Sequence, residues 1–168
     1  MKLLFSLLTF LGAIHLSAQE KKHYLLVVNK MEATMSIIDP KTKAAIAKVP
    51  TGEGPHEVVA SSDGKLAFVG NYGHQKPGNS LSVIDLEQKK EIKRIDLGPF
   101  IRPHGMVEKD GKIFFTSEGS RTVGCYDIKE DKISWIQGTG ESIGHMVAVT
   151  PDLKNVYVTN ILSHSVTW

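Results

Sequence analysis

Short apolar runs alternate with turn residues along the chain after residue 22. Residues 80–85 (SLSVID) switch between polar and apolar positions, a period of two that is typical of strands. Asp63-Gly64 and Asp110-Gly111 separate such runs, and Asp-Gly indicates a hairpin turn because glycine accepts the positive φ that the turn needs. No helical period follows the first 18 residues. The pattern predicts an all-β fold.

The runs recur as a repeated unit. His56, His104 and His145 each follow a proline or a glycine at the start of an aligned unit, and they are 48 and 41 residues apart. A period in this range, built from short strands, is typical of β-propeller blades. Residues 23–52 match the second to fourth strands of a unit, and the final SVTW lies within a third strand. We therefore expect a partial β-propeller of about 3.5 four-stranded antiparallel blades over residues 19–168, with units starting near residues 19, 55, 103 and 144.

The repeat resembles a known family. Residues 157–160 spell YVTN, the motif that names the YVTN family of β-propeller repeat proteins, and residues 80–98 (SLSVIDLEQKKEIKRIDLG) and the DGK turns match it as well. The resemblance implies a seven-bladed propeller, usually secreted or periplasmic, in a group where many members have no known chemistry. It extends less closely to lactonase-like hydrolases. Because this chain would supply about half a ring, we expect truncation at the C-terminus or self-association of open blade edges.

Residues 1–18 have the layout of a secretory signal peptide. Lys2 gives a positive start, an apolar run extends from Leu3 to Leu16, and the small Ser17-Ala18 precede a polar segment. The run is shorter than the roughly 20 residues of a transmembrane helix. We predict cleavage after Ala18, a periplasmic or extracellular location and no membrane span afterwards. An uncleaved anchor is the alternative, and the lack of a stop-transfer pattern disfavours it.

The composition limits which partners and which side-chain chemistry we expect. Twenty basic and eighteen acidic residues give a formal net charge of +2, so no strong field indicates a nucleic-acid partner. The single cysteine, Cys125, lies in an apparent strand, and we expect a buried, inert thiol. We expect Trp135 and Trp168 to pack between blades.

The repeated histidines mark the candidate site. If the first strand of each blade is innermost, His56, His104 and His145 line the mouth of the central channel. The other candidate ligand-binding residues of this face are Asn71, Glu118, Asn160 and Arg102. The imidazoles could bind a polar ligand, an anion or a metal, or they could only bond the backbone of their loops. Histidines on separate blades need not come within the roughly 2 Å of metal coordination, so we predict no metal site and no cofactor.

No complete catalytic constellation appears. Residues 140–144 (GESIG) match the G-x-S-x-G nucleophile elbow, but a strand follows in place of a helix, and the segment aligns with an inter-blade loop at residues 52–55. We therefore interpret the protein as a non-catalytic module that binds an unknown small ligand or protein. The alternative is a lactonase-like hydrolase that uses Glu118 or a histidine as base, with Arg102 orienting an anion. A metal or redox-associated propeller is the third hypothesis.

Overall fold

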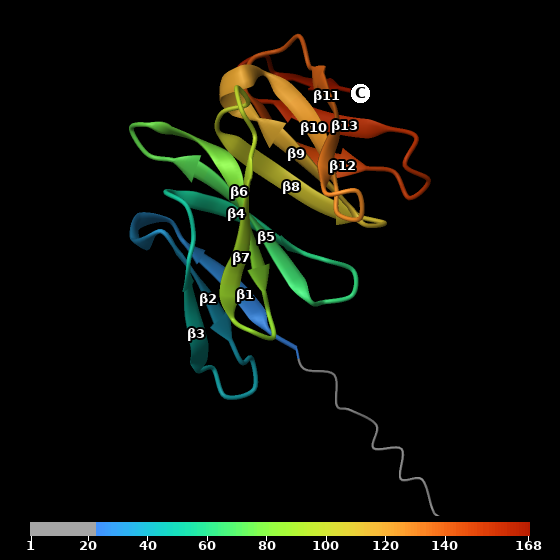
Figure 1. Ribbon diagram of the computed structural model, residues 1–168. Helices are drawn as coiled ribbons and strands as arrows, with labels where there is room; N and C mark the ends of the chain where they lie inside the picture. Colours follow the sequence, from blue (N-terminus) through green and yellow to red (C-terminus); the bar gives the residue numbers. More distant parts are fainter. Residues whose placement is uncertain (1–22) are drawn as a thin grey trace, which may run out of the picture.

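Fourteen strands form four antiparallel sheets in the computed structural model, which describes residues 23–168. The predicted signal peptide lies outside these residues. Within them there is no α-helix, only the single-turn 3₁₀ helices η1 (Lys30–Glu32) and η2 (Glu118–Ser120). Figure 1 shows the sheets following one another in chain order. The all-β prediction is confirmed, and the arrangement is that of a partial β-propeller.

The sheets hold three, four, four and three strands, as the repeat predicts. The first contains β1 (Leu25–Asn29), β2 (Thr34–Ile38) and β3 (Ala45–Pro50). The second contains β4 (Pro55–Ala60), β5 (Leu66–Gly73), β6 (Pro77–Asp85) and β7 (Lys90–Asp96). The third contains β8 (Pro103–Lys109), β9 (Lys112–Ser117), β10 (Thr122–Asp127) and β11 (Lys132–Gly138). The last contains β12 (Gly144–Val149), β13 (Val156–Asn160) and β14 (Ser165–Thr167).

The Asp-Gly turns join the first and second strands of the two complete sheets. Gly64 and Gly111 have φ values of +69° and +74°, a region that side chains disfavour. At the first of these turns, Oδ1 of Asp63 also accepts hydrogen bonds from Ser61 Oγ and from the Lys65 backbone N–H. The predicted hairpin turns are therefore present, and they return the chain antiparallel to itself.

The core lies between the sheets, in three clusters. Met35, Ile37 and Ile84 pack between the first and second sheets, and Phe114 and Val158 between the third and fourth. The largest cluster joins the two complete sheets through buried residues that include Phe68, Leu81, Val83, Ile113, Phe115 and Tyr126. Each complete sheet is thus covered on both faces by its neighbours. Consecutive residues of the middle strands β5 and β6 are consequently buried on both faces, despite a sequence pattern in β6 that suggests one polar face, whereas the outer strand β7 is mostly exposed.

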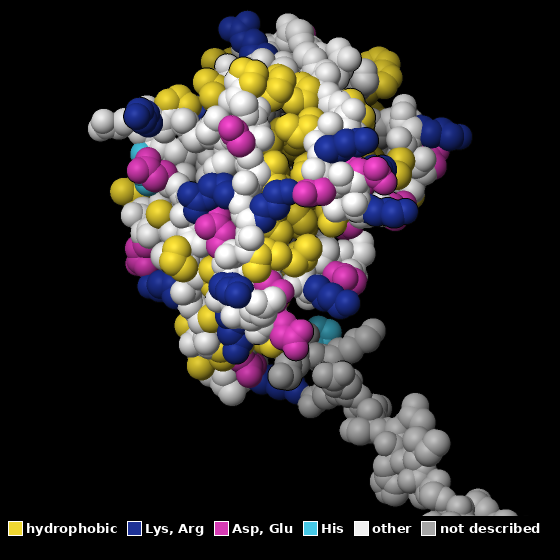
Figure 2. Space-filling view, in the orientation of Figure 1, with side chains coloured by type: hydrophobic (Ala, Val, Ile, Leu, Met, Phe, Trp, Pro, Cys, Tyr) yellow, Lys and Arg dark blue, Asp and Glu magenta, His cyan; other side chains and the backbone are white. Residues whose placement is uncertain are grey.

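The surface agrees with the nearly balanced charge. Figure 2 shows Lys and Arg side chains interspersed with Asp and Glu beside a band of hydrophobic side chains. None of the helical turns among residues 23–168 is long and apolar enough to cross a membrane. Cys125 is fully buried, and burial raises the pKa of its thiol, as expected for an inert cysteine.

The two tryptophans depart from expectation. Trp135 contacts the Phe114 ring, with 6.0 Å between centroids, but it is 39% exposed. Trp168 is 82% exposed. Trp135 thus packs partly between the third and fourth sheets, because Phe114 belongs to the cluster between them, and its place on the outer strand β11 leaves the rest of the ring exposed. No sheet within residues 23–168 covers Trp168.

Candidate functional site

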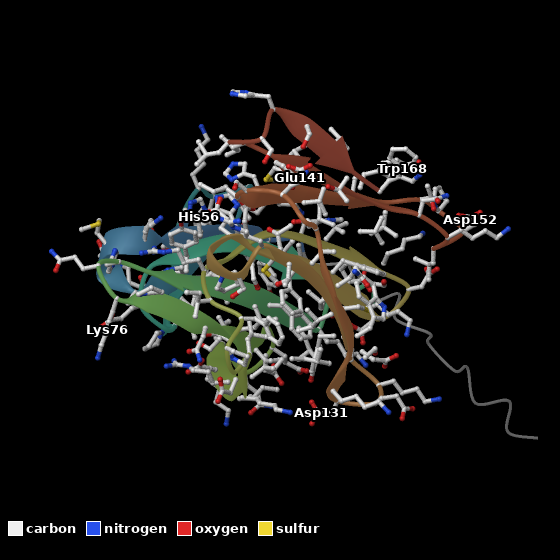
Figure 3. The ribbon with its side chains drawn as sticks, turned by 90° about the horizontal axis from the view of Figure 1, so that it is seen from above. His56, Lys76, Asp131, Glu141, Asp152 and Trp168 are labelled. Carbon is white, nitrogen blue, oxygen red and sulfur yellow. The ribbon has the colours of Figure 1, made fainter. Side chains whose placement is uncertain are left out.

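The first strands of three successive sheets bring three histidines into contact. β4, β8 and β12 lie side by side, and each carries its histidine as the second residue: His56, His104 and His145. The ring centroids are 4.1 Å apart for His56 and His104, and 3.9 Å apart for His104 and His145. In the view of Figure 3, His56 lies toward the middle of the molecule, whereas Lys76, Asp131, Asp152 and Trp168 lie at its rim.

A glycine explains why two of the strands come so close. A Cβ on Gly105 would lie 2.3 Å from the carbonyl oxygen of His145, so only glycine permits this approach of β8 to β12. Thr116 joins the two strands as well: its Oγ1 donates to the His145 carbonyl at 2.6 Å and accepts from the Gly105 N–H at 2.9 Å. This local structure brings the His104 and His145 rings together.

Glu118, the first residue of η2, holds a carboxylate beside the rings. Its Oε1 lies 2.7 Å from Nδ1 of His145 and 3.8 Å from Nε2 of His104, and its Oε2 accepts a 2.6 Å hydrogen bond from the Tyr72 hydroxyl. The side chain is only 10% exposed. Burial opposes its charge, but the hydrogen bonds from Tyr72 and His145 hold the pKa of this carboxyl below its usual value. Glu118 is therefore ionised at neutral pH.

His104 is the buried member of the stack. Its side chain is 5% exposed, and Nδ1 has no hydrogen-bond partner among residues 23–168. Burial lowers its pKa to about 4, outweighing the attraction of Glu118. The ring is consequently neutral near pH 7, with a lone pair available on one nitrogen.

Cationic side chains contact the Tyr72 ring. Arg102 lies 4.8 Å from the ring centroid and Lys30 lies 4.6 Å from it. Arg102 Nη2 also donates to the His74 carbonyl at 3.2 Å. The site therefore combines imidazole nitrogens, the Glu118 carboxylate and two cationic side chains.

The structure gathers five of the seven predicted ligand-binding residues and separates two. His56, His104, His145, Glu118 and Arg102 all surround or contact the Tyr72 and histidine rings.

Asn71 and Asn160 instead are buried in their own sheets. Asn71 accepts from the Gly52 N–H and donates to Ser80 and Ser82, while Asn160 donates to Ser165 and Thr167. Both amides therefore support neighbouring strands of their blades.

Tyr72 is the residue that sequence reasoning missed. It follows Asn71 directly in β5, so strand alternation places its side chain on the opposite face from Asn71. That alternation was the available signal. The GESIG segment is the inter-blade loop expected for it: the Ser142 N–H bonds to Ser163 Oγ, and β12 follows.

Two groups of potential metal ligands share His104. In one, His104, Glu118 and His145 each present a ligand atom within 4.8 Å of the others. In the second, His56, Glu57 and His104 do the same. The close stacking that creates both groups was not foreseeable from histidines on separate blades.

Comparisons with known proteins support a β-propeller-like fold. No protein-family model matches the chain. Antigen Lp49 of Leptospira interrogans serogroup Icterohaemorrhagiae serovar copenhageni (strain Fiocruz L1-130) is 26% identical over 136 residues, which are 78% of this chain and 29% of the antigen.

Two solved structures share the architecture. A hydrazine synthase chain of Kuenenia stuttgartiensis matches 87% of this chain and 45% of its own length, with a TM-score of 0.73 and 19% identity. A functionally unknown protein of Desulfotomaculum acetoxidans DSM 771 matches 84% of this chain and 46% of its own, with a TM-score of 0.69 and 15% identity. This chain spans less than half of each of these proteins, and the likeness supports a β-propeller-like fold.

Proposed function

We propose that the protein is a ligand-binding module of an exported β-propeller of the YVTN repeat type. Its binding site is the surface formed by His56, His104, His145, Glu118, Tyr72 and Arg102, which we name the histidine face. One observation carries this proposal: three equivalent strands place three histidines in ring contact beside an ionised carboxylate. A purely structural role would not require a buried His104 whose Nδ1 lacks a partner among the described residues.

The charges around Tyr72 indicate the class of ligand. Arg102 and Lys30 carry permanent positive charge, and His56 and His145 keep about a third of their side-chain surface exposed. These groups can donate hydrogen bonds to carboxylate or phosphate oxygens. A small anionic or polar molecule therefore suits the histidine face.

Export is part of the same proposal. The signal-peptide layout of residues 1–18 supports a periplasmic or extracellular location. The likeness to a protein that is named an antigen agrees with it.

A titration of the full chain tests the binding role. A panel of small carboxylates and inorganic phosphate is added while histidine ring signals are followed by NMR. We expect at least one panel member to shift the signals of the wild type and of His164→Gln, whose histidine is exposed and outside the cluster. The triple variant His56→Gln/His104→Gln/His145→Gln should bind that probe at least ten times more weakly while circular dichroism reports an intact fold. Equal binding by the triple variant, or none by the wild type, contradicts the proposal.

Hydrolysis is a second candidate because Glu118 and His145 form a carboxylate–imidazole pair at 2.7 Å. Such a pair can orient and activate a general base, and Arg102 can hold an anionic group of the substrate. If this function is right, turnover of a lactone panel is lost in Glu118→Gln and in His145→Gln, and it is retained in His164→Gln. Absence of turnover by the wild-type chain counts against it.

A further inference from the structure

The group formed by His104, Glu118 and His145 has the donor set of a metal site. We propose that these three side chains bind one divalent transition-metal ion, with zinc as the representative case. This inference rests on the proposed function and names a ligand class for the histidine face. It departs from the expectation drawn from sequence, because the rings are in contact instead of being spread around a wide channel.

The distances need little adjustment. Ligand atoms of a tetrahedral zinc site lie about 2.0–2.2 Å from the ion, which places them roughly 3.4 Å from one another. Oε1 of Glu118 lies 2.7 Å from Nδ1 of His145 and 3.8 Å from Nε2 of His104, and the three ligand atoms all lie within 4.8 Å of one another. Side-chain rotations that move these atoms by about an ångström would convert the group into a coordination site.

The donor types also suit a cation. Imidazole nitrogens and carboxylate oxygens are the ligands that zinc takes in proteins, and His104, His145 and Glu118 supply both kinds. Nε2 of His104, the nitrogen near Glu118, lies 3.8 Å from Oε1, which is beyond hydrogen-bond distance, so this contact does not occupy its lone pair. Two histidines and one glutamate leave a fourth position open on zinc. His145, with 32% of its side chain exposed, connects the group to solvent.

Neighbouring residues hold the ligands in place. The Tyr72 hydroxyl donates to the second oxygen of Glu118, and Thr116 donates to the His145 carbonyl. Such contacts orient metal ligands and increase affinity. Arg102 contributes positive charge 4.8 Å from the centre of the Tyr72 ring, where it favours an anionic group as the additional ligand. The metal and the anionic ligand class are therefore compatible.

The second group of potential ligands, which contains His56, Glu57 and His104, is less suited to bind an ion. Nδ1 of His56 lies 3.9 Å from Oε1 of Glu57, and the two side chains are 31% and 33% exposed. Glu118, by contrast, is 10% exposed and is hydrogen-bonded through both oxygens. We therefore assign the ion to Glu118 and use Glu57→Gln as the matched control, since both substitutions remove one carboxylate beside His104.

Calorimetric titration of the tag-free, metal-depleted chain with Zn²⁺ tests the assignment. Titration with Co²⁺, followed by its visible absorption, reports the ligand geometry. We expect one ion per chain. His104→Gln, Glu118→Gln and His145→Gln should each weaken Zn²⁺ binding at least tenfold, while Glu57→Gln and His164→Gln should bind as the wild type does. Circular dichroism checks the fold, and Glu118→Gln serves as the decisive variant if His104→Gln does not fold.

Three results would overturn the assignment: no Zn²⁺ binding by the wild type, equal binding by the Glu118→Gln and wild-type chains, or a loss in Glu57→Gln as large as in Glu118→Gln. The panel titration separates this inference from the proposed function. If carboxylates or phosphate bind the metal-depleted chain through the three histidines while Zn²⁺ does not bind, the metal assignment fails alone. If neither probe binds, both proposals fail.

Discussion

The second, third and last sheets carry similar second strands but bury them to different extents. Phe68, Phe114 and Tyr157 occupy equivalent repeat positions in β5, β9 and β13, and they are 1%, 3% and 40% exposed. Phe68 packs toward the third sheet and Phe114 toward the fourth, whereas no sheet within residues 23–168 covers Tyr157. Burial of this position therefore comes from the neighbouring blade, and the strand's own sheet cannot provide it.

The largest expected effect tests that interpretation directly. Phe68→Ala should lower the free energy of unfolding by about 3–5 kcal/mol, since it removes a fully packed ring between two sheets. Tyr157→Ala should lower it by less than about 1 kcal/mol, because the side chain already contacts solvent. Urea unfolding followed by circular dichroism measures both values. Similar losses for the two variants would show that blade-to-blade packing does not determine the cost.

The buried asparagines allow a second comparison of an inner sheet with the last one. Asn71→Ala should cost about 2–3 kcal/mol, because it leaves the Gly52 N–H without its Asn71 acceptor and removes two bonds to serines. Asn160→Ala should cost about 1 kcal/mol, since Oδ1 of Asn160 has no partner among the described residues and only the amide bonds are lost. The same urea measurement applies.

The asparagine variants also test the sequence-based site. Neither substitution should change binding of the anion panel, because both amides are turned into their own sheets. Weakened binding in a folded Asn71→Ala chain would show that Asn71 takes part in ligand binding, as the sequence analysis predicted.

The pH dependence of the free energy of unfolding should differ between variants of the buried His104 and of the exposed His164. The folded pKa of His104 is about 4, below its ordinary value of 6.5, so the unfolded chain takes up the proton first. The contribution of neutral His104 to the free energy of unfolding is therefore present above pH 6.5 and is lost as the pH drops. In the metal-free chain the loss reaches about 2 kcal/mol at roughly pH 5. Urea unfolding across this range should show the loss in the wild type and in His164→Gln. His104→Gln should show a much flatter profile, and an unchanged slope in that variant would assign the loss to other groups.

Much of the fold was predictable because its determinants are local. Alternation in residues 80–85 and the Asp-Gly turns predict strands and hairpins whatever surrounds them, and the observed β6 and the positive φ values of Gly64 and Gly111 agree. The exposure of Trp135 was not predictable in this way. It depends on which outer surface a neighbouring sheet covers, and strand periodicity contains no information about that.

In the candidate site, too, some features follow from local sequence and others from the packing of the sheets. The repeat alone determined the number of strands and the equivalent positions of His56, His104 and His145, since both follow from the spacing of short local patterns. Only the tertiary structure decided that their rings touch, that His104 is buried and neutral, and that Glu118 lies between Tyr72 and His145. These features depend on the distance between neighbouring sheets. Gly105 permits the close approach of β8 to β12, and the sequence of one strand does not specify how near the next sheet lies.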